Sequence, residues 1–137
     1  MILHHYTSMN HVPLILKEAC IETTESNVDM VHQHWGPDVV WLVDPSLPPA
    51  DVPSEYPHGL SSVKSRIRFT VDVPDSFAIK WTSWEYFHEM NEHWRRVFVE
   101  AGGGELAADH WYVCPSPIFS HRWMSITDLH TGQEVTF

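Results

Sequence analysis

The segment from residue 66 to residue 74 carries the clearest pattern in the chain, an alternation of apolar and polar residues. The apolar positions are Ile67, Phe69, Val71 and Val73, and the polar positions are Arg66, Arg68, Thr70 and Asp72. Successive side chains of a β-strand point to opposite faces, so this pattern predicts a strand with one apolar and one polar face. Pro74 ends the strand. The fold class must therefore include a β-sheet.

Other short segments also have the residue types of strands. These are residues 2–7, the apolar run 39–43, and the later segments 111–113, 117–119 and 123–126, followed by a turn and a last strand through Val135. The run 39–43 is apolar throughout, which predicts a strand buried on both faces. Residues 77–81 are either a further short strand or an extended lead-in to the next element.

Two segments have helical periodicity. In the first, Val12, Ile15, Leu16 and Ala19 recur at three and four residues, with Pro13 in the first turn and Cys20-Ile21 as the end. In the second, Thr82-Ser83-Trp84-Glu85 has the form of a capping box, and the helix is predicted to run to Gly102. Its apolar positions are Phe87, Met90, Trp94, Val97 and Phe98, which are predicted to belong to the core.

The order of these segments predicts a single α+β domain over residues 1–137, with mixed, mostly antiparallel sheets and two main helices. No internal repeat and no linker to a second domain is visible. Residues 22–38 are polar and aperiodic, and a proline-rich stretch follows from Pro45 to Gly59. Both are predicted loops, and the second is placed to lie over the domain.

The composition excludes several function classes. The formal net charge is −10, with 8 Lys and Arg against 18 Asp and Glu, so general nucleic-acid binding is disfavoured. No segment approaches the length of a membrane span, and no signal peptide is visible at the start. The two cysteines, Cys20 and Cys114, match no zinc-binding spacing and suit a reducing compartment. We therefore expect a cytoplasmic protein without a membrane partner.

The 11 histidines suggest metal binding by number only. His32 and His34 stand two residues apart in a predicted loop, and His88 and His93 are five apart on a predicted helix, where a zinc pair uses four. We expect no metal site. Nucleophilic catalysis has no better support, because the chain has no G-x-S-x-G motif and Cys114 is predicted to lie in the core.

The first strand holds the strongest candidate for chemistry. His5 and Thr7 are two residues apart and leave the same face of the strand, where an imidazole and a hydroxyl can hold a ribose diol or a carboxamide. The alternative is that His5 only closes one end of a barrel.

The opening of the chain resembles that of the ADP-ribosyltransferase superfamily. Leu3-His4-His5-Tyr6-Thr7-Ser8 followed by Val12-Pro13-Leu14-Ile15-Leu16 is similar to the H-x-T strand and following helix of the DNA-targeting ADP-ribosyltransferase toxins and RNA phosphotransferases. The likeness extends weakly to Val39–Pro45, Arg66–Pro74 and Asp109–Val113. The order of the Y-T-S, V-W-L, V-D-V-P and W-Y-V segments also resembles small uncharacterised proteins of phages and actinobacteria.

The resemblance implies an NAD-binding site with NAD as the substrate. His5 would hold the ribose, and Thr7 would support the first strand and the nicotinamide end. The aromatic residue that stacks on nicotinamide would be Tyr6, Trp41 or Tyr56.

The resemblance also concerns the catalytic residue and the residues that would bind the pyrophosphate of NAD. Relatives place a catalytic glutamate directly before the apolar late strand, where this chain has His110, with Asp109 one residue earlier. Arg66 and Arg68 are candidate partners of the pyrophosphate, and the alternative is that both are solvent-facing edge charges.

Two functions follow as expectations. The first is an ADP-ribosyltransferase-like protein that transfers ADP-ribose to a protein or a small molecule. The second is a catalytically inactive relative, for example phage-encoded, that binds a host protein or a nucleotide signal, since compact acidic proteins fit basic grooves.

Overall fold

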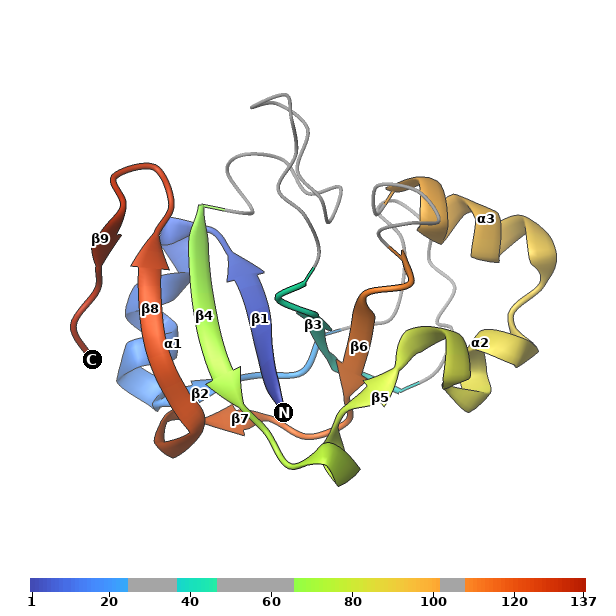
Figure 1. The fold of residues 1–137 in the computed structure, drawn as a ribbon, viewed down its shortest axis with the longest axis horizontal. Helices are drawn as coiled ribbons and strands as arrows, with labels where there is room; N and C mark the ends of the chain where they lie inside the picture. The colour runs from blue at the N-terminus through green and yellow to red at the C-terminus, as the bar shows by residue number, and fades with distance from the viewer. Residues whose placement is uncertain (25–36, 47–65, 102–107) are drawn as a thin grey trace.

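The central strand of the sheet is formed by the first residues of the chain. A computed structural model describes residues 1–24, 37–46, 66–101 and 108–137 (Figure 1). It contains a seven-stranded sheet in the order β5-β6-β3-β1-β4-β8-β9, with every pairing antiparallel. The strands are β1 (Ile2–Thr7), β3 (Val40–Val43), β4 (Ile67–Asp72), β5 (Ile79–Lys80), β6 (Trp111–Cys114), β8 (Trp123–Asp128) and β9 (Gln133–Glu134). A second sheet pairs β2 (Cys20–Ile21) with β7 (Ile118–Phe119).

One helix lies against a face of the large sheet, and the other two lie at one of its ends. They are α1 (Val12–Glu18), α2 (Glu85–Glu89) and α3 (Glu92–Ala101). Figure 1 shows α1 behind β4 and β8, whereas α2 and α3 lie at the end formed by β5 and β6. None of the helices in the described ranges has the length and apolar character that crossing a membrane requires.

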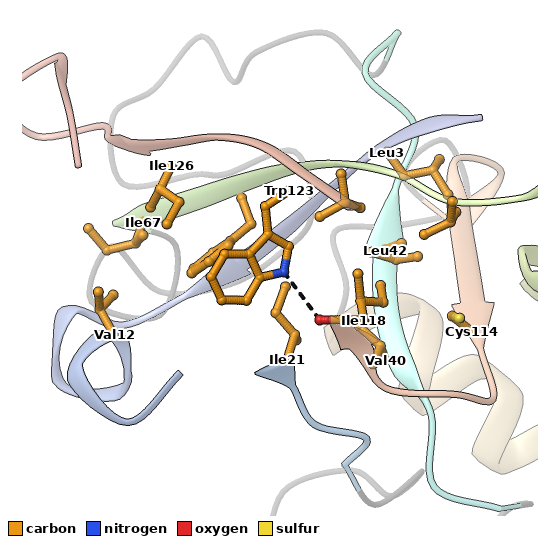
Figure 2. Packing of buried hydrophobic residues seen from close by; sticks show 13 residues of the cluster. Leu3, Val12, Ile21, Val40, Leu42, Ile67, Cys114, Ile118, Trp123 and Ile126 are labelled. Atoms are coloured by element: carbon orange, nitrogen blue, oxygen red, sulfur yellow. Dashed lines mark hydrogen bonds between the residues drawn. The ribbon is translucent and has the colours of Figure 1, made fainter. Parts of the chain in front are cut away.

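One face of the sheet carries the larger core. The alternation predicted for β4 is confirmed, since Ile67, Phe69 and Val71 are fully buried while Asp72 is exposed. Apolar side chains from α1, β2 and β7 cover these residues, and those of the neighbouring strand β8 lie beside them on the same face (Figure 2). They include Val12, Ile21, Ile118, Trp123 and Ile126. The Trp123 indole donates a hydrogen bond from Nε1 to the Ile118 carbonyl at 3.2 Å, so its polar atom is satisfied within the core.

The opposite face carries a second core, chiefly over β3 and β6. Its centre is Trp81, whose ring lies 4.8 Å from Phe87 and 5.1 Å from Trp111 between centroids. Trp84 and Met90 are also buried there. The run 39–43 is therefore packed on both faces, as predicted, because Val40 and Leu42 belong to the first core and Val39 and Val43 to the second.

The predicted architecture is confirmed at the level of an α+β fold with antiparallel sheets, but the second helix is not continuous. Met90 has extended backbone angles and separates α2 from α3, because its side chain is buried in the second core. The predicted capping box is wrong as well. Residues 81–83 form a 3-10 turn, and Trp84 precedes α2 without a side-chain cap, since its indole is buried instead.

Two smaller predictions also need correction. Cys20-Ile21 is strand β2 and not a helix end, because the chain reverses at Ala19, whose φ of 53° is left-handed. In the segment 77–81 only Ile79–Lys80 is a strand. Most of both predicted loops, with His32, His34 and Tyr56, lies outside the described residues.

Candidate functional site

The side chains of β1 divide between the two faces of the sheet. Its neighbours are β3 and β4, so the strand is interior. Leu3 belongs to the larger core and Tyr6 packs on the second core. With a period of two, His5 and Thr7 share the face of Leu3, while His4 shares the face of Tyr6. The residues predicted to bind one ligand are therefore distributed over both sides of one strand.

His5 is fixed by its neighbours in one orientation. Its Nδ1 lies 3.0 Å from the Trp41 carbonyl oxygen. A carbonyl can only accept, so Nδ1 carries the hydrogen and Nε2 is left as an acceptor. The ring packs edge-on against Phe69, with 6.3 Å between centroids. Burial lowers the pKa of His5, and the nearby His11 adds to this effect, so the imidazole is neutral at pH 7.

Thr7 has a partner that the sequence patterns did not single out. Its hydroxyl lies 3.1 Å from the Nδ1 of His11. The chain turns directly after β1 through the 3-10 turn Met9–His11, which returns the side chain of His11 to the end of the strand. We call His5, Thr7 and His11 the His5 site. The only signal in the sequence was a histidine four residues after the threonine.

The aromatic candidates lie on the other side of the sheet from the His5 site. Trp41 packs in the second core, with 6.2 Å between its ring centroid and that of Trp81 and the same distance to Trp111. Tyr6 is half-buried beside this core, edge-on to His4. The third candidate, Tyr56, lies outside the described residues.

The two candidate arginines have different environments. Arg68 is not an edge charge, because its strand β4 is paired on both sides, with β1 and with β8, whereas Arg66 directly precedes that strand. Arg68 stands directly across from Tyr6 in the sheet. Arg66 instead forms a two-pronged ion pair with Asp128, from Nε to Oδ1 at 3.1 Å and from Nη2 to Oδ2 at 2.8 Å. The guanidinium of Arg66 is therefore occupied by its ion pair with Asp128.

Asp128 also organises the turn between β8 and β9. Its Oδ1 accepts the backbone N–H of His130 at 3.0 Å, and its carbonyl accepts that of Gly132 at 2.7 Å. The hydrogen bonds from Arg66 hold the pKa of Asp128 at about 2. The Asp128 carboxylate on β8 thus connects Arg66 at the start of β4 with the turn that leads to β9.

An Asp128→Asn variant is expected to melt several degrees below the wild type at pH 7. The amide keeps the size of the side chain but removes the charge that pairs with Arg66. Thermal unfolding followed by circular dichroism measures the difference. Glu92→Gln is the matched control, because it breaks the exposed ion pair with Arg96 and such pairs contribute little. Equal losses in the two variants would show that the Arg66–Asp128 pair is not special.

The candidate catalytic residues lie directly before β6. Asp109 is exposed, and His110 is half-buried with its Nδ1 3.3 Å from the Ser46 hydroxyl. The His110 carbonyl accepts the N–H of Asp44 at 2.8 Å, which extends the β3–β6 ladder by one step. The Ser46 N–H in turn bonds Asp44 and, as the main cause, lowers the pKa of that carboxyl.

These residues and the His5 site are separate in the described structure. Strand β3 lies between β1 and β6. Within the described ranges, neither Asp109 nor His110 is hydrogen-bonded to His5 or Thr7.

The described residues offer no metal site and no reactive thiol. Among them, no three His, Cys, Asp or Glu side chains are grouped so that they could hold a metal ion. His88 belongs to α2 and His93 to α3. Cys20 and Cys114 are both free and buried, and burial raises the pKa of Cys20 to about 11 and that of Cys114 above its usual range. Both thiols are therefore protonated at neutral pH.

The chemistry of β1 and its neighbours has to be inferred from the residues themselves, since no protein-family model, curated protein or solved structure matches this chain.

Proposed function

We propose that this protein is an ADP-ribosyltransferase-like protein that binds NAD at the His5 site. The observation that carries the proposal is the pairing of a neutral imidazole with a hydroxyl on one face of the central strand. The resemblance of the segment from Leu3 to Leu16 to the opening of that superfamily supports the same reading. An antiparallel sheet with β1 at its centre is compatible with such a fold.

The donors and acceptors of the His5 site suit a ribose diol. The Nε2 of His5 accepts a hydrogen bond, because the hydrogen of the ring is on Nδ1. The Thr7 hydroxyl both donates and accepts, and His11 adds a second imidazole beside it. Adjacent hydroxyls of a ribose need this mixture of partners.

The proposed reaction transfers ADP-ribose to a protein or a small molecule. The bond between ribose C1′ and nicotinamide breaks, and its electron pair leaves with nicotinamide. A nucleophile of the acceptor forms the new bond to C1′, and its proton passes to a base. Positive charge develops on the ribose and requires a carboxylate nearby. The candidates from the sequence, Asp109 and His110, lie beyond β3 from the His5 site, so the described residues assign neither of these two roles.

The first test compares two histidines that are neighbours on β1. We expect His5→Ala to reduce nicotinamide release from NAD at least tenfold, since one specific contact to the ribose is lost. His4→Ala is the matched control, because it removes the same group from the opposite face of the same strand, and it should retain activity. Thr7→Val, which removes only the hydroxyl, should also lower the rate. Full activity in a folded His5→Ala protein would reject the site.

A second candidate function is a catalytically inactive relative that binds a nucleotide or a protein. The observation in its favour is the position directly before β6, where His110 is bonded to Ser46 and the nearest carboxylate, Asp109, is exposed. This candidate predicts that NAD or ADP-ribose raises the melting temperature of the wild type while no nicotinamide is released. Release of nicotinamide that depends on Asp109 would favour the enzyme instead.

A further inference from the structure

Arg68 carries a charge that the described structure does not compensate. Its Nε is buried and has no hydrogen-bond partner among the described residues. In the part of the chain that the structure describes, the side-chain ion pairs of arginine join Arg66 to Asp128 and Arg96 to Glu92, and none involves Arg68. Arg68 is only partly exposed, so water solvates its guanidinium incompletely.

The strands on either side of Arg68 present hydroxyl groups. Tyr6 stands opposite it on β1, and Thr127 stands opposite it on β8. Glu134 stands opposite Thr127 on β9, and its carboxylate accepts a hydrogen bond from the Thr127 hydroxyl at 3.0 Å. Arg68 donates a hydrogen bond to the Tyr6 hydroxyl, and burial, the larger effect, raises the pKa of Tyr6, so the hydroxyl keeps its own hydrogen and can donate it in turn.

Arg68 and its neighbours on β8 on this face belong to neither core, and Tyr6 packs at the margin of the second core. The second core covers β3 and β6 on the same face, but its members do not include residues of β4 or β8. Thr70 and Ser125, which continue the face of Arg68 on those two strands, are half-exposed. The His5 site lies on the opposite face of β1.

An uncompensated arginine at such a place is unfavourable in a folded protein. A guanidinium cannot lose its proton at any pH at which the protein is folded, so burial has to be balanced by an anion or by hydrogen bonds. Acidic residues are abundant in this chain, with a net charge of −10, and yet none of those in the described ranges forms an ion pair with Arg68. The balancing anion is therefore to be sought outside the described protein groups.

We propose that Arg68 and Tyr6 form a binding site for an oxyanion, a phosphate or carboxylate group of a small molecule, on the face of the sheet opposite to the His5 site. The guanidinium donates to the oxyanion in the two-pronged manner that Arg66 uses toward Asp128. The Tyr6 hydroxyl supplies a further donor. This site stands whether or not the protein binds NAD at the His5 site.

The test uses inorganic phosphate and acetate as probes, in a buffer without other oxyanions. We expect one of them to raise the melting temperature of the wild type by several degrees as its concentration exceeds the dissociation constant. The phosphate arm and the acetate arm together show which oxyanion is preferred. Arg68→Met should abolish the rise, and Arg68→Lys should weaken it, because an ammonium lacks the planar fork. Arg96→Gln changes the net charge equally and should keep the rise.

Two further measurements make the outcome decisive. Arg68→Met should melt no lower than the wild type without added anion, since it removes an uncompensated charge. In the wild type, a bound oxyanion should offset the charge of Arg68 and raise the pKa of His4, which nuclear magnetic resonance can follow. The proposal is wrong if neither probe stabilises the wild type, or if Arg68→Met responds as the wild type does.

The same variants separate this site from the proposed NAD site, because NAD itself contains phosphates. Stabilisation by NAD that is lost in His5→Ala but kept in Arg68→Met belongs to the His5 site. The reverse pattern would support the oxyanion site and reject the proposed location of NAD.

Discussion

A Phe69→Ala variant is expected to lose about 3–5 kcal/mol of unfolding free energy. Phe69 lies at the middle of β4 and is fully buried. Its ring packs edge-on against Trp123, with 5.2 Å between centroids, and against His5. Removing the ring leaves a cavity between an interior strand and the elements that cover it. Urea unfolding at pH 7 measures the loss.

The control for this variant is Phe77→Ala. Phe77 is 45% exposed in a 3-10 turn, so its truncation should change the free energy of unfolding by less than about 1 kcal/mol. Phe69→Leu should fall between the two, since most of the volume is retained. A loss below 1 kcal/mol for Phe69→Ala would contradict the position of β4 at the centre of the core.

The second large effect is a loss of folding stability at acidic pH. Burial lowers the pKa of His4 to about 4, with a further contribution from the Arg68 charge, and burial also lowers the pKa of His5. In the unfolded chain both rings take up protons near pH 6.5. Between about pH 6.5 and 4 the unfolded state therefore binds more protons than the folded state. Stability is fully present above pH 6.5 and decreases as the pH falls toward 4.

The size of this loss of stability follows from the shift in the pKa of His4. The shift corresponds to roughly 3 kcal/mol, which partial exposure of the ring reduces to about 1–2 kcal/mol. A His4→Gln variant should lose less stability than the wild type between pH 7 and pH 4.5, as followed by urea unfolding. His130→Gln removes an exposed ring and should leave the pH profile unchanged. Superimposable profiles of His4→Gln and the wild type would contradict this account. Asp128 does not interfere, because its contribution is lost only below about pH 3.8.

The strands could be predicted from the sequence because their signals are local. The alternation from Ile67 to Val73 and the apolar run 39–43 depend only on neighbours along the chain, and the structure confirms both. The break between α2 and α3 could not be predicted in this way. It depends on the burial of Met90 in the second core, which forms only when the sheet is folded.

The candidate site depends even more on contacts between distant parts of the chain, which local patterns do not show. Spacing along β1 shows that His5 and Thr7 share a face, and the same rule places Tyr6 on the other. What spacing does not show is the partner of each group. Arg66 and Arg68 look equivalent in the sequence, but among the described residues only Arg66 forms an ion pair, because Asp128 reaches it from a strand far along the chain.

The place of β1 at the centre of the sheet also determines when the sheet can form during synthesis. β1 is the first strand of the sheet to be translated, yet its register joins it to Val43 on one side and to Ile67–Asp72 on the other. Their outer neighbours, β6 and β8, are made later still. Such distant pairings make folding slow. Until β4 is available one edge of β1 stays unpaired on the nascent chain, and this is the stage at which association with other strands competes with folding.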